Sequence, residues 1–228
     1  MISVNSSSST LSYINQVNEK KQEEEEKLAS SKRINSAADD PAGLQIASRL
    51  TSEINGYQQL SYNAQDQINV NQVQEGALGA IGSGLQRANE LAVQSGSPLA
   101  DDDAIQAEFD ELTEQINTVA EEVFGVPNFL SGLDASDPEA TQQALESAFG
   151  TISDAASQLG ADSNALSSQV STYQTSYVNA SESRSRIEDT DYAASSSQQQ
   201  QLNVLLQASV INQKDEEERK GLLVNQLV

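Results

Sequence analysis

A single stretch of helical periodicity, residues 40–94, constrains this chain more than any other feature. Asp40 and Pro41 form a strong helix start, because aspartate is favoured as an N-cap and proline is tolerated at the first helical position. Gly96 and Pro98 mark its end. A helix of about fifty residues far exceeds the usual ~12 and needs partner helices along its length. Its apolar stripe comprises Leu44, Ala47, Leu50, Ile54, Tyr57, Ala64, Ile68, Leu78, Ile81, Leu85, Ala88 and Ala92.

The remaining segments also predict helices. Their ranges are 10–33, 102–123, 138–190 and 192–228. The acidic triplet 101–103 is expected to cap a helix, since it lacks the spaced ligands and turn glycine of a calcium loop. The predicted fold class is therefore all-α, a long antiparallel helical rod or bundle with coiled-coil-like terminal helices. At most a short β-hairpin or loop is expected near residues 124–136, the turn-rich apolar segment.

The predicted helices occur in a symmetric order along the chain. A terminal helix and a long core helix come first, and a long core helix and a terminal helix come last. Such a chain goes out and comes back, which brings both ends together. We expect residues 1–33 and 192–228 to form one domain from the two chain ends, and residues 34–191 to form a helical core domain.

Composition excludes several classes of function. The 228 residues include no histidine and no cysteine, so the commonest general base, the thiolate nucleophile and the usual zinc ligands are missing. No enzyme, cofactor or metal site is predicted. With 34 Asp and Glu against 12 Lys and Arg, neither nucleic acid nor an anionic membrane is an expected partner. No apolar run reaches the ~20 residues of a membrane span, and the polar start does not resemble a cleaved signal peptide.

The two terminal helices share an unusual pattern, an apolar seam interrupted by charge. The interruptions are residues 19–27 and 213–220, each a similar distance from its own chain end. If the helices pair antiparallel, the two stretches are expected to lie side by side, where their excess of carboxylates would repel. A heptad threaded through each helix predicts the seam positions Leu11, Ile14, Glu25, Leu28, Leu202, Leu205, Glu216, Leu223 and Leu227.

Four ordered motifs resemble the bacterial flagellins. They are Lys32-Arg33-Ile34-Asn35-Ser36-Ala37-Ala38-Asp39-Asp40-Pro41-Ala42-Gly43-Leu44-Gln45-Ile46-Ala47, the stretches 74–78 and 85–94, the short stretch 105–108, and Ser183-Arg184-Ser185-Arg186-Ile187-Glu188-Asp189-Thr190-Asp191-Tyr192-Ala193. The last favours flagellin over the related hook–filament junction proteins. The resemblance covers residues 30–123 and 150–211. It implies a minimal flagellin, in which a short loop replaces the variable outer domains.

The resemblance also implies a function and a location. A flagellin is a non-enzymatic subunit that self-assembles into the filament of the bacterial flagellum for motility. It is secreted to the extracellular filament without a cleaved signal peptide. By resemblance its partners are further copies of itself, a flagellar export chaperone, the filament cap and the hook–filament junction proteins. The seam positions of the terminal helices would then be assembly contacts, and the polar stretches would control polymerisation.

A second class of function stays open, that of a soluble flagellin-derived monomer recognised by a flagellin-sensing Toll-like receptor. The resemblance places a receptor-binding face at Arg87, Leu91, Gln94 and Glu108. The chain departs from the family pattern at Ser31, which stands where flagellins usually have glycine, and in its charged terminal helices. Those charged faces either line water, pair with neighbouring lysines and arginine, or weaken polymerisation.

Overall fold

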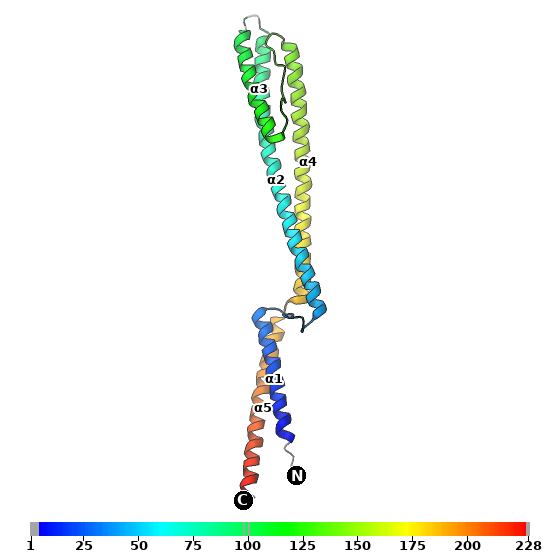
Figure 1. Cartoon of the computed structure of the whole chain (residues 1–228), viewed down its shortest axis with the longest axis vertical. Coiled ribbons are helices and arrows are strands. Elements are labelled where there is room, and N and C mark those ends of the chain that lie inside the picture. The colour runs from blue at the N-terminus through cyan, green and yellow to red at the C-terminus, as the bar shows by residue number, and fades with distance from the viewer. Residues whose placement is uncertain (1–4, 98, 100, 227–228) are drawn as a thin grey trace. The chain divides into compact units, whose positions relative to one another are not determined.

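A computed structural model describes residues 5–97, 99 and 101–226, with side chains described between Thr10 and Arg219. The described chain forms five helices: α1 (Asn5–Ser30), α2 (Pro41–Ser95), α3 (Asp102–Phe124), α4 (Pro138–Glu188) and α5 (Tyr192–Gln226) (Figure 1). Helix α1 packs antiparallel to α5, and α2 packs antiparallel to α4. Among the described residues, β-structure is limited to an isolated antiparallel bridge between Lys32 and Asp189. The predicted all-α fold class is confirmed.

The helix boundaries follow from local capping chemistry. Asp40 Oδ1 accepts a hydrogen bond from Gly43 N at 2.8 Å, and Asp101 caps α3 by accepting from Ala104 N at 3.3 Å. Gly125 ends α3 in the left-handed region at φ 67°, which glycine adopts without a Cβ clash. The acidic triplet thus caps a helix, and the segment after Gly125 is a loop rather than a hairpin.

The chain divides into two compact units. Unit 1 comprises Met1–Gly56 and Ser176–Val228, and unit 2 comprises Tyr57–Thr175. Unit 1 contains the α1·α5 pair together with the first part of α2 and the last part of α4. Unit 2 contains the rest of α2 and α4 and the whole of α3.

The hydrophobic core of unit 2 lies where α3 joins the α2·α4 pair. Leu85 on α2 and Phe109 on α3 are fully buried, and Leu145 on α4 is 1% exposed. Three helices can enclose such side chains on all sides, which two helices cannot. The core residues of this cluster are Ile81, Leu85, Ala88, Leu91, Ala92, Ile105, Phe109, Ile116, Ala120, Leu130, Leu133, Ala135, Leu145 and Ala148.

An irregular segment, residues 125–137, closes this core as a strap. Two side-chain amides of α3 hold its backbone. Asn117 donates to Leu130 O at 2.9 Å and accepts from Leu130 N at 2.8 Å. Gln106 donates to Leu133 O at 3.1 Å and accepts from Ala135 N at 2.9 Å. Each amide therefore replaces the backbone pairing that a neighbouring strand would supply to a buried segment.

Unit 2 has a part without a third helix, which we call the stem: residues 57–80 of α2 and 151–175 of α4. The part that contains α3, residues 81–150, we call the tip. Within the stem only Ala64, Asn71 and Leu78 are buried, all on α2. Asn71 Nδ2 donates to Ser163 Oγ on α4 at 3.3 Å. A buried polar contact of this kind favours one axial register of a helix pair at some cost in stability.

Candidate assembly surfaces

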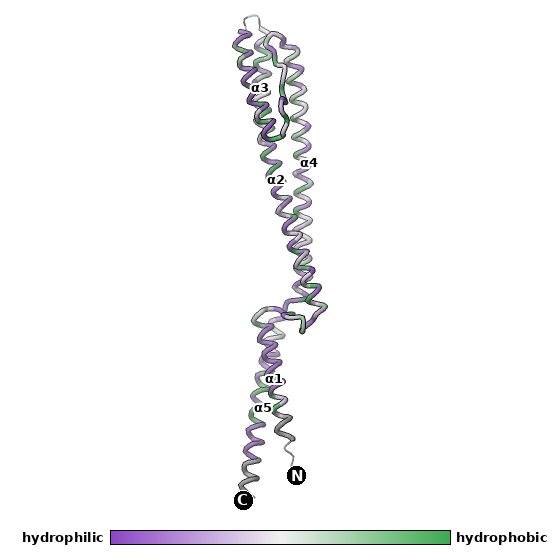
Figure 2. Tube along the Cα trace, in the orientation of Figure 1, coloured by the Kyte–Doolittle hydropathy of each residue, from purple (hydrophilic) through white to green (hydrophobic). Residues whose placement is uncertain are grey.

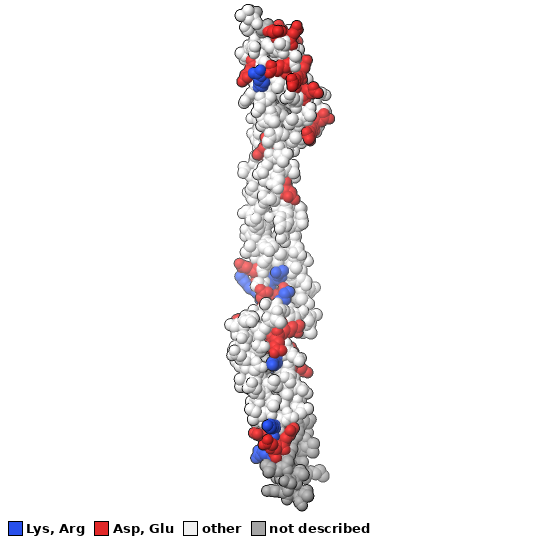
Figure 3. Space-filling view, turned by 90° about the vertical axis from the view of Figure 1, so that its left-hand side faces the viewer, with Lys and Arg blue, Asp and Glu red and all other residues white. Residues whose placement is uncertain are grey.

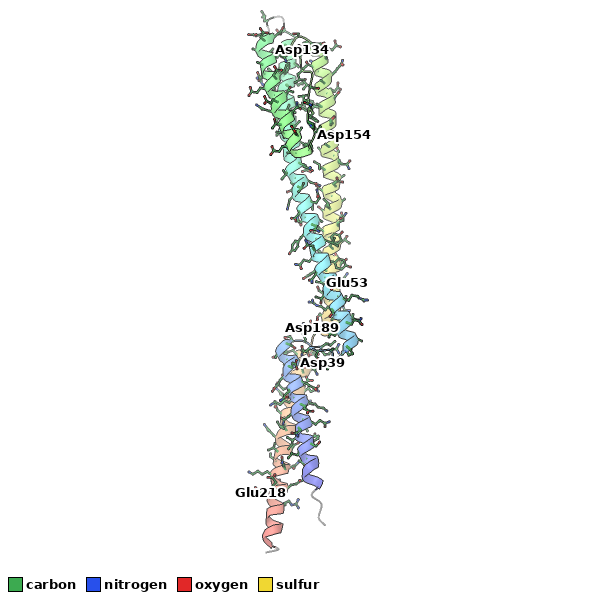
Figure 4. The ribbon with its side chains drawn as sticks, viewed as in Figure 1. Asp39, Glu53, Asp134, Asp154, Asp189 and Glu218 are labelled. Atoms are coloured by element: carbon green, nitrogen blue, oxygen red, sulfur yellow. The ribbon has the colours of Figure 1, made fainter. Side chains whose placement is uncertain are left out.

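In unit 1, a junction of backbone and side-chain hydrogen bonds joins the segment after α1 to the end of α4. Lys32 Nζ lies 2.5 Å from Glu188 Oε1, and Arg33 N donates to Glu188 O at 2.6 Å. Thr190 N donates to Ser31 O at 3.1 Å. Figure 4 labels Asp189 at this junction. These contacts fix the point from which α1 and α5 run side by side.

The same junction contains a strained residue, Ser31, with φ at 60°. The left-handed region disfavours a residue with a Cβ by roughly 1–2 kcal/mol, whereas the greater freedom of glycine in the unfolded chain offsets part of any gain. We therefore expect Ser31→Gly to raise the free energy of unfolding of unit 1 by about 0.5–1 kcal/mol. Urea unfolding followed by circular dichroism measures it. Ser30→Gly, one residue earlier inside α1, should instead lower stability, and a gain at both positions would contradict the role of φ.

Asp39 organises the connector that leads into α2. Its carboxylate accepts from Ser36 N at 2.8 Å and from Asn35 N at 2.9 Å. These backbone N–H groups, that of Ser36 foremost, lower the pKa of Asp39 below its ordinary value of 3.8. Because the folded state favours the charged form, Asp39 stabilises the fold above that ordinary pKa. The stabilisation is lost as the pH falls through the lowered pKa.

We accordingly expect Asp39→Ala to lower the melting temperature at neutral pH, and the deficit relative to the unmodified chain to shrink on acidification below pH 3.8. Thermal melts across this range measure the difference. Asp154→Ala is the control, an exposed carboxylate on α4 (Figure 4). A deficit for Asp39→Ala that stays constant with pH would contradict the assigned hydrogen bonds.

The register of the α1·α5 pair follows from the junction. With Ser31 bonded to Thr190, antiparallel helices of equal rise place residue 19 opposite about residue 202. A cleft lined by Thr10, Tyr13, Ser209, Asn212 and Glu216 agrees with this register. The start of stretch 213–220 therefore lies level with the first turn of α1, about eleven residues or ~16 Å beyond the α5 residues that lie opposite stretch 19–27. The two polar stretches do not lie side by side, so the sequence-based expectation was wrong.

Some residues on the seam between α1 and α5 differ from the seam positions that were predicted from the sequence. On α1 the inward residues include Val17 and Glu24, which are buried, while Leu11 and Glu25 are exposed. On α5, Leu205 is exposed and its neighbour Leu206 is half-buried. The residues Ile14, Leu28 and Glu216 are half-buried and Leu202 is buried. The side chain of Leu223, and all of Leu227, lie outside the described residues.

A buried carboxylate interrupts the apolar seam of α1. Glu24 is 6% exposed, and its Oε1 lies 2.8 Å from Lys27 Nζ. Its Oε2 is buried and has no hydrogen-bond partner. The segment of α5 opposite, within residues 193–213, carries no charged residue. Glu216 Oε2 is likewise buried without a partner. Such oxygens oppose pairing of the helices, because each has left water without gaining a donor. Figure 2 shows α1 as mainly hydrophilic.

The outer side of α5, which faces away from α1, is apolar and exposed to solvent in the single chain. Val204 and Ile211 are 65% and 59% exposed, and Leu205 and Val210 are also exposed. Leu202 is buried on the opposite side, which faces α1, so this part of α5 is apolar on two opposite sides, with Asn203 and Gln207 between them. An exposed apolar side of this kind is typical of a surface that packs against a partner. The described part of unit 1 covers one side only, so α5 has a surface suited to packing against another helix.

In unit 2, Arg87 connects α2 to α3. Its guanidinium contacts Glu108 Oε1 at 2.8 Å and Glu90 Oε2 at 3.3 Å. Hydrogen bonding to Glu108 first, and to Glu90 second, raises the pKa of Arg87. Leu91 is 3% exposed and belongs to the core, whereas Gln94 is exposed. The structure thus places Arg87, Gln94 and Glu108 where a partner can reach them, and Leu91 where it cannot.

No helix in the described part of the chain combines the length and apolarity needed to cross a bilayer. Within the same described part, no group of three or more His, Cys, Asp or Glu side chains has the arrangement to hold a metal ion.

Comparison with known proteins identifies the family. Residues 2–135 match the bacterial flagellin N-terminal helical region, and residues 142–212 match the bacterial flagellin C-terminal helical region. The chain belongs to the bacterial flagellin family. Only residues 136–141 separate the two matched regions, so this flagellin has no variable outer domain between them. The family is structural and not catalytic.

Curated relatives agree with this assignment. The chain is similar to a flagellin of Clostridium tyrobutyricum, with 43% identity over 131 residues, covering 54% of this chain and 35% of that protein. It is similar to a flagellin of Salmonella rubislaw, with 47% identity over 97 residues, covering 41% of this chain and 20% of that one. Flagellin 1 of Proteus mirabilis is 44% identical over 110 residues, covering 46% and 30%. The matched stretches thus span about a third or less of these relatives.

Proposed function

We propose that this chain is a structural subunit that self-assembles into the helical filament of a bacterial flagellum, outside the cell. Membership of the flagellin family supports a filament role. The structural observation that carries the proposal is the apolar outer side of α5, with Val204 and Ile211 more than half exposed. Burial of such side chains against another copy is the largest favourable contribution available to association.

Within this proposal, residues 1–33 and 192–228 act as the inner domain of the filament and residues 34–191 as the helical core domain. The exposed Leu11 and Leu205 are then available to neighbouring subunits rather than to the α1·α5 seam. A flagellar export chaperone, the filament cap and the hook–filament junction proteins are proposed as further partners.

Sedimentation and negative-stain electron microscopy of the full chain at increasing concentration and salt test the proposal. We expect pelletable filaments. Val204→Gln combined with Ile211→Gln should raise the concentration needed for pelleting about tenfold, because two apolar contacts per subunit are lost. The matched control is Val93→Gln combined with Val126→Gln, two exposed valines of the tip, which should pellet like the unmodified chain. A chain that remains monomeric under all these conditions would overturn the proposal.

A second function is recognition by a flagellin-sensing Toll-like receptor. The observation that favours it is the placement of Arg87, which is the only cation among residues 57–175. Its side chain is 51% exposed and two carboxylates position it. Arginine in such a position is a frequent anchor of protein interfaces. We propose that Arg87, Gln94 and Glu108 contact the receptor and that Leu91 supports their helix from the core.

Receptor activation by purified monomer tests this function. Arg87→Ala should reduce activation at least about tenfold, in the range expected when an interface anchor is truncated. Arg49→Ala is the control, since Arg49 also lies exposed on α2 with an i,i+4 carboxylate, Glu53. Equal activation by the two variants and the unmodified chain would contradict the receptor proposal and leave the filament proposal standing.

A further inference from the structure

Glu188, at the end of α4, takes part in several of the contacts that form the junction of unit 1. Its side chain is 13% exposed. The carboxylate lies 2.5 Å from Lys32 Nζ through Oε1 and 3.9 Å from Arg184 Nε through Oε2. Its backbone carbonyl accepts from Arg33 N at 2.6 Å and from Ile34 N at 3.4 Å. One residue of α4 therefore holds the segment after α1 through both its main chain and its side chain.

Arg184 extends these contacts to α2. It lies one turn before Glu188 on α4, and its guanidinium donates to Thr51 Oγ1 at 3.4 Å. Thr51 in turn donates to Ala47 O within α2 at 2.8 Å. A continuous series of polar contacts therefore joins three segments of unit 1: the connector after α1, the end of α4 and the first part of α2.

The pair between Lys32 and Glu188 differs from its neighbours in what it connects. Half of the chain's 12 Lys and Arg lie in residues 27–49 and 184–186, and on the face that Figure 3 presents, basic and acidic side chains lie next to one another in this part of unit 1. Within-helix pairs at i,i+3 or i,i+4 are formed by Lys21, Lys27, Arg49, Arg184 and Arg186. The pair of Lys32 with Glu188 instead joins two segments that are far apart in the sequence.

The terminal helices have few other contacts that could set their register. Among the described side chains of α1 and α5, Val17 and Leu202 are the apolar ones that are buried. A seam with so few apolar contacts specifies its axial alignment weakly. Both helices leave from the junction, since α1 ends at Ser30 and α5 begins at Tyr192. Holding these two ends together lowers the entropic cost of pairing the helices, and it fixes the point from which their residues are matched.

We propose that Glu188 is a positioning residue for assembly. Its carboxylate, held between Lys32 and Arg184, sets the register in which α1 and α5 pair, and with it the surface that the terminal helices present to another copy. The inference rests on the proposed function of self-assembly. It deepens that function by assigning control of assembly to an ion pair within one chain.

Urea unfolding of the free chain tests the ion pair without requiring polymer. Glu188→Gln keeps the shape of the side chain and the backbone carbonyl but removes the charge. It should increase the unfolding equilibrium constant of unit 1 about tenfold, as expected when a hydrogen bond between charged groups is lost. The matched control on the same helix is Glu182→Gln, because Glu182 is 60% exposed and pairs with Arg186 at i,i+4. This control should have little effect.

A double-mutant cycle separates the pair from a general effect of either residue. Lys32→Met should destabilise unit 1 in the same direction as Glu188→Gln, and Lys32→Arg, which keeps a cation, should lie close to the unmodified chain. Combining Lys32→Met with Glu188→Gln should lose less than the product of the two single effects, because each substitution removes the same interaction. Multiplicative single effects, or equal effects of Glu188→Gln and Glu182→Gln, would overturn the ion pair.

Sedimentation tests the connection to assembly. Glu188→Gln and Lys32→Met should each raise the concentration needed for pelleting by up to about tenfold, since a smaller fraction of chains would hold the terminal pair in the register that assembles. Glu182→Gln and Lys32→Arg should pellet like the unmodified chain. Equal pelleting of Glu188→Gln and Glu182→Gln would overturn the role of Glu188 in assembly while the filament itself remained. Absence of polymer from the unmodified chain would instead overturn the proposed function, and this inference with it.

Discussion

Replacing Asn117 by alanine is expected to lower the free energy of unfolding of unit 2 by about 2–6 kcal/mol. Asn117 is the partner of both the N–H and the C=O of Leu130, a residue that is 2% exposed. The substitution removes both hydrogen bonds. It leaves two buried backbone groups without partners, and each such group costs about 1–3 kcal/mol. Urea unfolding monitored by circular dichroism measures the loss.

The matched control is Gln115→Ala, on the same helix two residues earlier. The amide of Gln115 is exposed and donates to Glu111 within α3 at 3.2 Å, so its removal should change stability by less than about 0.5 kcal/mol. Hydrogen exchange provides a second measurement. The amide proton of Leu130 should exchange faster in Asn117→Ala and unchanged in Gln115→Ala. Equal losses of stability for the two variants would show that the strap is held by apolar packing alone.

The helices could be predicted from sequence because their determinants are local. Asp40 and Pro41 start α2, Gly96 follows its end, and the observed bounds Pro41–Ser95 agree with the predicted ones. The stripe positions that lie in the tip, Ile81, Leu85, Ala88 and Ala92, are buried as predicted. Spacing, caps and stop residues suffice for such elements, because each acts over a few neighbours along the chain.

The strap could not be predicted in the same way. Gln106 and Asn117 are polar residues on a helix, and on that basis alone they would be placed in water. Their bonds join residues 13 to 29 positions apart, so they depend on how the loop returns over α3. The one local signal was the turn-rich apolar composition of residues 124–136, which indicated a covering segment but gave no partners.

The register of the terminal helices was predicted wrongly for a different reason. Heptads can be threaded through a weakly apolar helix in more than one way, and the residues near Leu11 and Glu25 allowed two choices. The junction, with Ser31 bonded to Thr190, fixes the observed one. In that register Val17 is buried, and the inward carboxylate is Glu24 rather than Glu25. A shift of one position along a helix turns a side chain by about 100°, which changes which charge is buried.

The difference between the buried Glu24 and the exposed Glu25 leads to the second prediction with a large expected effect. Glu24→Leu is expected to raise the free energy of unfolding of unit 1 by about 1–4 kcal/mol, the range seen when a buried ion pair is replaced by apolar packing. The change removes a carboxylate oxygen that is buried without a partner. It also restores an apolar residue between Val17 and Leu28 on the side facing α5. Lys27 loses its partner at little cost, because its side chain already reaches water at 26% exposure.

Glu25→Leu is the matched control, with the same substitution one residue along. The Glu25 side chain is 48% exposed and lies 3.6 Å from Lys21, and exposed pairs of this kind contribute at most ~1 kcal/mol. Urea unfolding at low and high salt separates the two sites, because screening weakens an exposed charge far more than a buried one. The gain from Glu24→Leu should persist at high salt. Equal effects of both substitutions at each salt concentration would show that burial at position 24 does not govern the pairing of α1 with α5.

The same two variants connect stability to assembly. If the α1·α5 pairing is completed only as subunits join, part of the conformational entropy cost of pairing falls on assembly, and a more stable seam lowers that part. Glu24→Leu should therefore form pelletable filaments at a lower concentration than the unmodified chain, while Glu25→Leu should not. Pelleting that is unchanged by Glu24→Leu, despite a measured gain in stability, would mean that pairing of the terminal helices does not limit assembly. Control would then rest with surfaces outside the seam, such as the outer side of α5.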